Sequence, residues 1–255
     1  MSKQVIEPSL QPCMPQAATI SDEKELRVQL AAVYRLIDQF QMSDLIDTHI
    51  SARLPGSGSF LLNPFGMMFH EITSSNLVKV DFKGHAIDSQ AWSVNPAVVI
   101  HSAILSARPD VNCVLHTHSR YGTAVSMLEC GLLPASQFAL MFYNRVADHD
   151  YEGVVLDLAE QERLVKDLGN KDVMILRNHG LLTVGRTIAE AFILMFYLEK
   201  ACEAQILAQS TGSPLIIPSE EVCQAAMQGQ DSADWRQLQW NALVRLLEQD
   251  PSYRA

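Results

Sequence analysis

The 255-residue sequence lacks several features that would assign it to a specialised class of protein. It contains no uninterrupted run of about 18 apolar residues, so no membrane-spanning helix is expected. Its five cysteines are scattered and never form a Cys-x-x-Cys pair, which is typical of a reducing compartment rather than a disulfide framework. No segment repeats with a period of about 20–50 residues, which excludes a solenoid or a propeller.

Basic residues are also scarce, with 19 Lys and Arg against 29 Asp and Glu, and the net charge is −10. Proteins that bind nucleic acids or anionic membrane surfaces need basic surface, so we expect neither partner. The first 20 residues are polar and lack the apolar segment of a secretory signal. The sequence therefore predicts a flexible N-terminal arm over residues 1–20, a single domain over residues 21–255 and a cytoplasmic location.

Apolar spacing along residues 21–255 predicts a mixed α/β domain. Apolar residues recur every three or four positions in five segments, which predicts helices over 21–42, 97–108, 158–168, 188–209 and 234–248. Short apolar segments predict strands that end near Pro55, Asn63 and Lys83, and further strands over 112–118, just after residue 151, and over 172–178. We expect helices that flank a central, mostly antiparallel sheet.

The main candidate for chemistry is a pair of histidines, His116 and His118, on the strand predicted over 112–118. Residues two apart on a strand face the same side, about 7 Å from each other, so both imidazoles can bind one zinc or iron ion. The alternative is two surface histidines. His179 favours the metal hypothesis because it follows another apolar strand and precedes Gly180, which allows a tight turn. Three strand-end histidines would leave an open coordination position, as a catalytic metal requires.

The other histidines are predicted to have lesser roles. His101 lies on an apolar helix, where packing against the core is expected. His149 lies in a charged segment and is expected to be solvated. His49, His70 and His85 lie in polar turns and are expected to be structural or exposed.

Several segments together resemble the class II aldolase/adducin superfamily, and most of all its adducin-like bacterial branch. The similar segments span residues 25–212 and include VVIHSAILSARPDVNCVLHTHSRYGTAVSM, CGLLPAS and ILRNHGLLTVG. The resemblance implies a three-layer α/β/α, class II aldolase-like fold with a central, mostly antiparallel sheet. It also implies a homo-oligomer, with a tetramer favoured.

In the aldolases that the sequence resembles, the matching histidines bind a divalent metal, usually zinc, that stabilises an enediolate. The resemblance therefore implies that His116, His118 and His179 are the metal ligands. The sugar-phosphate aldolases also have an acid–base glutamate four residues before the helix histidine, where this sequence has Ala97. Their phosphate-binding Gly-Asn loop is replaced by residues 47–51, so a phosphorylated substrate is not expected. Glu71 is the candidate for the missing proton carrier, with His149 or Asp148 as alternatives.

Three functions follow from this sequence. The first is a metal-dependent aldolase-type lyase that acts on a small, unphosphorylated hydroxy-carbonyl compound. The second is a non-haem iron(II) oxygenase or decarboxylase at the same three histidines, because imidazole ligands suit iron as well as zinc. The third is an adducin-like binding or scaffold protein without catalysis, which the alanine at position 97 favours.

Overall fold

The computed structural model describes residues 22–87, 93–153, 158–229 and 233–255. The arm predicted over residues 1–20 lies outside these ranges. Of the helices in the described residues, none has the length and apolar content that crossing a bilayer would require.

A seven-stranded sheet in the order β3-β2-β1-β4-β7-β6-β5 forms the centre of the molecule. Every neighbouring pair is antiparallel except β5 and β6, which are parallel, so the predicted mostly antiparallel sheet is confirmed. The strands are β1 (His49–Leu54), β2 (Ser59–Leu62), β3 (Val78–Asp81), β4 (Cys113–Thr117), β5 (Val146–His149), β6 (Val173–Leu176) and β7 (Gly180–Gly185).

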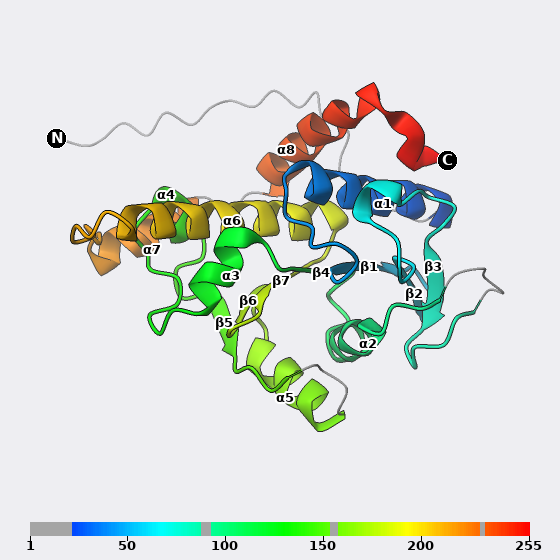
Figure 1. Cartoon of the computed structure of the whole chain (residues 1–255), viewed down its shortest axis with the longest axis horizontal. Helices are drawn as coiled ribbons and strands as arrows, with labels where there is room; N and C mark the ends of the chain where they lie inside the picture. Colours follow the sequence, from blue (N-terminus) through cyan, green and yellow to red (C-terminus); the bar gives the residue numbers. More distant parts are fainter. Residues whose placement is uncertain (1–21, 88–92, 154–157, 230–232) are drawn as a thin grey trace.

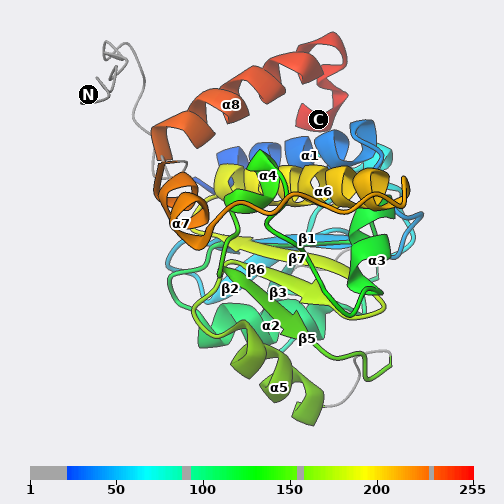
Figure 2. The ribbon, with the colours of Figure 1, turned by 90° about the vertical axis from the view of Figure 1, so that its left-hand side faces the viewer.

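Helices cover both faces of this sheet, which gives the predicted three layers (Figures 1 and 2). Figure 2 shows α1 and α6 on one face, α2 and α5 on the other, and α8 stacked outside α1 and α6. The helices are α1 (Glu23–Gln39), α2 (Val98–Ala107), α3 (Arg120–Ser126), α4 (Gln137–Leu140), α5 (Leu158–Leu168), α6 (Ile188–Gln209), α7 (Glu220–Gly229) and α8 (Ala233–Leu246). Three short 3-10 helices complete the described elements: η1 (Phe69–Glu71), η2 (Leu247–Gln249) and η3 (Pro251–Arg254).

Side chains of the inner strands point alternately to the two faces of the sheet and contribute to a hydrophobic core on each face. Cys113 and Leu115 of β4 belong to the larger core, which also contains α1 and α6 residues, whereas Val114 belongs to the smaller core with α2 and α5 residues. Because side chains alternate along a strand, His116 points to the same side as Val114. The end of β4 therefore directs one histidine toward α2.

Two strands of the structure were not predicted. One is the edge strand β5 at Val146–His149. The strand predicted just after residue 151 falls on a segment that includes residues 154–157, which lie outside the described ranges. The sequence analysis also did not predict β7, which starts directly after His179. All six residues of β7 are buried, so the strand lacks the polar–apolar alternation that identifies a half-exposed strand.

Candidate metal centre

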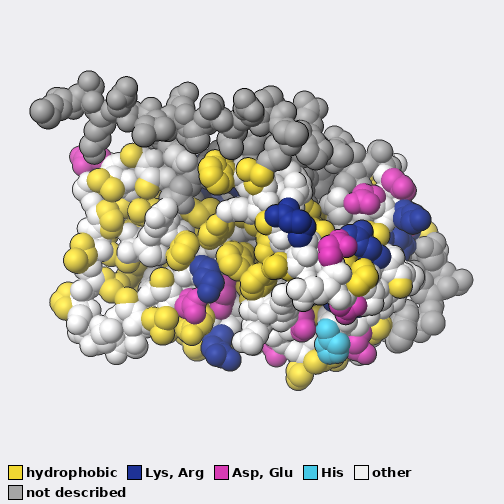
Figure 3. Space-filling model, turned by 90° about the horizontal axis from the view of Figure 1, so that it is seen from above, with side chains coloured by type: hydrophobic (Ala, Val, Ile, Leu, Met, Phe, Trp, Pro, Cys, Tyr) yellow, Lys and Arg dark blue, Asp and Glu magenta, His cyan; other side chains and the backbone are white. Residues whose placement is uncertain are grey.

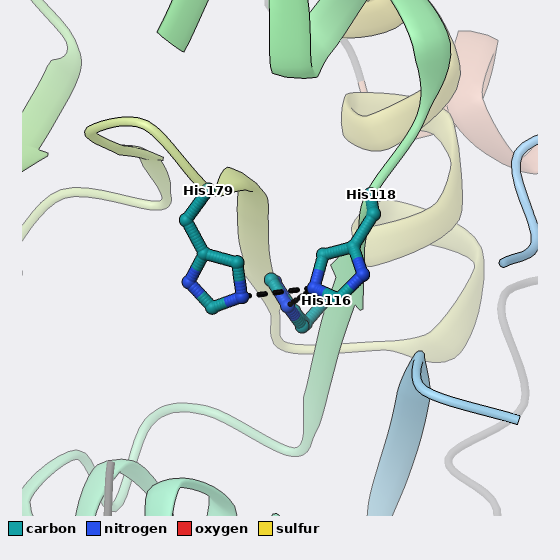
Figure 4. A group of neighbouring side chains, drawn as sticks. All are labelled: His116, His118 and His179. Carbon is teal, nitrogen blue, oxygen red and sulfur yellow. Dashed lines mark hydrogen bonds between the residues drawn. The ribbon is translucent and has the colours of Figure 1, made fainter. Parts of the chain in front are cut away.

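Three histidines meet at one end of the central strands of the sheet. His116 lies in β4, His118 follows β4 directly, and His179 lies in the turn between β6 and β7. The antiparallel register places Thr117 opposite Leu181, which brings the end of β4 beside the start of β7. Figure 4 shows the three imidazoles turned toward one another.

The Nε2 atoms of these imidazoles converge. Nε2 of His118 lies 2.9 Å from Nε2 of His116 and 2.8 Å from Nε2 of His179. One ligand atom from each of the three side chains lies within 4.8 Å of the other two. The structure therefore brings together all three histidines that the sequence analysis selected as metal ligands.

The opposite ring nitrogens show which lone pairs face the centre. Nδ1 of His116 donates a hydrogen bond to the carbonyl oxygen of Leu181 at 2.9 Å, and a carbonyl can only accept. Nδ1 of His118 lies 3.0 Å from the carboxylate of Asp44. In the neutral rings, Nε2 then carries a lone pair, and lone pairs this close repel unless a cation lies between them. The donor set thus fits a divalent metal with outer hydrogen bonds that orient its ligands.

Burial keeps two of these imidazoles in the neutral form that binds metals. It lowers the pKa of His116 well below its ordinary value, and the neighbouring histidines lower it further. Burial, followed by the proximity of His118 and His149, lowers the pKa of His179 to about 4. Protons therefore compete only weakly for these two nitrogens at neutral pH.

The turn that carries His179 depends on two special residues. Asn178 has a φ of 56°, in the left-handed region that asparagine tolerates better than most residues. We predicted that Gly180 supplies the turn, but its importance is close approach. A Cβ atom at Gly180 would lie 2.4 Å from the backbone oxygen of Thr117 and 3.3 Å from Cδ2 of His118. Glycine at this position lets β7 approach the metal-site end of β4.

The three histidines open into a cavity of about 590 Å³, a size that suits a small metabolite. Ala97 is one of the residues that line this cavity. It occupies the position at which a sugar-phosphate aldolase is expected to have its glutamate. That position therefore faces the cavity, but it carries no ionisable group. None of the described residues that line the cavity is Lys or Arg. The other lining residues are Asp44, Ile46, Asp47, His49, Phe65, Asn95, Pro96, Ile100, Thr123, Tyr151, Gly153 and Asn178.

A chain of buried polar side chains supports the cavity wall behind His116. Oγ of Ser51 lies 2.5 Å from Nδ1 of His101, and Nε2 of His101 lies 2.6 Å from Nδ1 of His49. Burial lowers the pKa of His101 to about 3. The imidazole of His49 in turn lies against that of His116, with ring centroids 4.8 Å apart. This chain fixes the orientation of His49 at the cavity.

His49 is a site residue that the sequence analysis missed. It was expected in a polar turn, but it is the buried first residue of β1 and pairs with His116 in the sheet. The expected packing of His101 in the interior is confirmed, because its side chain is fully buried. His49 and Ser51 are two positions apart on one strand, so their side chains share a face. This spacing was the signal in the sequence that could have revealed their contacts with His101.

The structure does not bring Glu71 together with the three histidines. Its carboxylate accepts a hydrogen bond of 2.7 Å from the backbone N–H of Met68, in the exposed turn at η1. Glu71 is not among the described residues that line the metal-site cavity. A role for Glu71 in proton transfer stays a prediction.

The two alternative proton carriers also have partners outside the cavity. His149 was expected to be solvated, but it is 5% exposed, and its Nδ1 lies 2.8 Å from a carboxylate oxygen of Asp167. The burial follows from its position at the end of β5, which packs against α5. Asp148 forms an ion pair with Arg177 at 3.1 Å.

The three-layer fold with three histidines at the end of its central strands is an architecture of the class II aldolase type. Residues 28–206 match the family model described as Class II Aldolase and Adducin N-terminal domain, and the chain belongs to this family. The resemblance inferred from the sequence is thereby confirmed.

Individual relatives agree with this assignment. The chain is 49% identical to an aldolase II superfamily protein from Pseudomonas syringae, whose crystal structure matches with a TM-score of 0.88 over 91% of this chain and 96% of that chain. It is 32% identical to the L-fuculose 1-phosphate aldolase from Glaciozyma antarctica PI12, with a TM-score of 0.84 over 95% and 97% of the two chains. Alpha-adducin from Rattus norvegicus is 46% identical over 198 residues, which are 75% of this chain and 27% of the adducin.

The carboxylate of Asp44 is expected to strengthen metal binding through His118. Replacing Asp44 with asparagine removes the negative charge that holds Nδ1–H of His118 and so orients its ring toward the metal. We expect zinc affinity to fall by about 10- to 100-fold. Competition against a chelating dye measures this change. Asp81→Asn, which removes a carboxylate from the distant β3 turn, is the control, and equal affinities in the two variants would contradict the role of Asp44.

Proposed function

We propose that His116, His118 and His179 bind a divalent metal, zinc or alternatively iron(II), and that this chain is an aldolase-type lyase. Its substrate class would be a small hydroxy-carbonyl compound without a phosphate group. The convergence of the three Nε2 atoms on one point carries this proposal. When bound, the metal supplies a Lewis acid that polarises the substrate carbonyl.

Asp47 is the group that we assign to proton transfer. It lines the cavity, and its carboxylate makes no hydrogen bond within the described part of the chain. Cleavage of an aldol requires a base that takes the proton of the substrate hydroxyl while the carbon–carbon bond breaks. The carboxylate of Asp47 would accept that proton and return one to the carbon that receives the bonding electron pair. His49, held by His101, would orient a substrate oxygen by hydrogen bonding.

The charge of the cavity supports an unphosphorylated substrate. Its described lining contains the carboxylates of Asp44 and Asp47 and neither Lys nor Arg. A phosphate group carries a charge of about −1.5 to −2 at neutral pH and would meet these carboxylates without a cationic side chain to balance it. The relative from Glaciozyma antarctica is named for a phosphorylated sugar, so the two proteins would differ in this respect.

Matched substrate pairs test this proposal. Protein loaded with zinc or with iron(II) is assayed for aldehyde release from small ketoses and from their 1-phosphates, including L-fuculose and L-fuculose 1-phosphate. We expect kcat/KM to favour the unphosphorylated member by about tenfold or more, because like charges repel in a cavity of low dielectric. Preference for the phosphorylated member would contradict the substrate class. Failure to cleave any compound with either metal would contradict the lyase.

A second candidate, a binding or scaffold protein without catalysis, is favoured by one pair of observations. The chain is 46% identical to a segment of alpha-adducin, and Ala97 removes an ionisable group from the cavity wall. Co-sedimentation with actin filaments in the absence of any cleavage activity would favour this candidate. Oxygen uptake by the iron(II)-loaded protein would instead favour an oxygenase.

We also propose a homo-oligomer, with a tetramer favoured, in the cytoplasm. Large apolar side chains are exposed on α4, at the end of α6, and along the segment and helix that follow: Phe138, Leu207, Ile216, Ile217 and Val222. Figure 3 shows the molecule from above, and hydrophobic side chains gather on the half of that face where α7 and the end of α6 lie. The four cysteines of the described residues are unpaired, which supports the location. Light scattering that gave a monomer mass would contradict the oligomer.

A further inference from the structure

A second cavity, of about 580 Å³, lies at the opposite end of the central strands from the metal site. His179 precedes β7 and Arg186 follows it, so the six residues of β7 separate the two sites by about 20 Å. None of the described residues lines both cavities. The second cavity is therefore a separate feature of the fold.

The lining of this cavity carries a positive charge, whereas the chain as a whole carries a negative one. Among the described residues that line it, four side chains are cationic and two are carboxylates, a formal excess of two positive charges. The whole chain carries −10. The cations are Arg145, Lys171, Arg186 and Arg236, and the carboxylates are Asp172 and Glu190.

The two carboxylates are engaged by partners other than Lys171 and the Arg186 guanidinium. Glu190 forms an ion pair with Arg236 at 2.7 Å, and its second oxygen accepts the backbone N–H of Arg186. Asp172 lies 3.3 Å from Arg108, whose side chain is not part of the cavity lining. The carboxylates therefore leave positive charge available at the wall.

Two cationic side chains, Lys171 and Arg186, are available to bind a ligand. The Lys171 ammonium donates a hydrogen bond of 2.6 Å to the neutral carbonyl of Val146, which does not cancel its charge. The Arg186 guanidinium makes no hydrogen bond or ion pair within the residues that the structure describes, and it attracts the carboxylate of Asp110 only at longer range. The 22-residue helix α6 also starts two residues after Arg186, and the positive end of its dipole adds to the field.

We propose that this cavity binds a small, multiply charged oxyanion, either a phosphate compound or a di- or tricarboxylate. The planar guanidinium of Arg186 would bind two of its oxygens, and the Lys171 ammonium would bind a third. The volume is that of a metabolite site rather than of a macromolecular groove. This site is independent of the metal centre and of the proposed lyase activity.

Calorimetric titration with two probes, inorganic phosphate and succinate, tests the site and distinguishes the two sources of the anion. We expect at least one probe to bind, and Arg186→Gln and Lys171→Gln each to weaken its binding by about tenfold. Lys83→Gln is the matched control, because it removes the same charge from an exposed turn near β3 and should leave the affinity unchanged. Circular dichroism verifies that each variant is folded.

Three results would overturn the proposal. The first is that neither probe binds at about 10 mM, well above the range of a specific metabolite site. The second is equal affinity in wild type, Arg186→Gln and Lys171→Gln. The third is loss of binding in His179→Ala with unchanged binding in Arg186→Gln, which would place the anion at the metal centre.

Discussion

Gly180→Ala is expected to damage both the fold and the metal centre. The added Cβ would lie 2.4 Å from the backbone oxygen of Thr117, so β4 or β7 must move, and the neighbouring His118 and His179 must move with them. Overpacking of this kind lowers the free energy of unfolding by about 1–3 kcal/mol. We expect zinc affinity to fall by about tenfold or more, because the three Nε2 atoms would no longer converge.

Gly229→Ala is the matched control, since a Cβ at this end of α7 meets no heavy atom within 4 Å among the described residues outside its own helix turn. Denaturant unfolding and zinc titration of both variants measure the two effects. The control is expected to resemble wild type in both. Wild-type stability and zinc affinity in Gly180→Ala would show that the close approach of β4 and β7 does not matter for the site.

Asp47→Asn is expected to lower the turnover of a cleaved substrate by about 100-fold or more while metal binding is unchanged. The amide cannot accept the proton of the substrate hydroxyl, and general base catalysis contributes at least this much in many enzymes. The exposed position of Asp47 makes a folding defect unexpected. Steady-state kinetics and metal content, measured on the same preparation, separate the two properties.

Glu71→Gln decides between the two candidate proton carriers. Its carboxylate caps an exposed turn by accepting a hydrogen bond from Met68, and glutamine can replace that bond. We expect turnover in Glu71→Gln to stay within about twofold of wild type, because surface changes of this kind have small effects. The opposite pattern, a large loss in Glu71→Gln and none in Asp47→Asn, would return the role to Glu71 and overturn the assignment of Asp47.

Local patterns in the sequence were sufficient for much of the fold. The apolar spacing over residues 188–209 predicted α6 at its observed bounds, because a long helix repeats its signal over many turns. The two-residue spacing of His116 and His118 on a predicted apolar strand indicated one shared face. His179 was selected because it follows another apolar strand and precedes Gly180, and the family resemblance agreed with that choice.

Features that depend on contacts between distant segments could not be predicted in this way. The contact between His49 and His101 joins residues 52 positions apart, and it forms only when α2 packs under β1. The close approach at Gly180 requires the pairing of β4 with β7, a strand that the sequence analysis missed. Asp47 and Tyr151 lie outside regular elements, and only the fold brings them to one cavity.

The central claim is that three converging imidazoles bind one divalent metal. The most direct measurement is elemental analysis of the untagged protein as purified and after reconstitution, with His179→Ala as the comparison. We predict about one zinc or iron ion per chain in wild type, with the ion lost in the variant because only two of the three ligands remain. Wild-type protein that holds no metal even after reconstitution would contradict the claim.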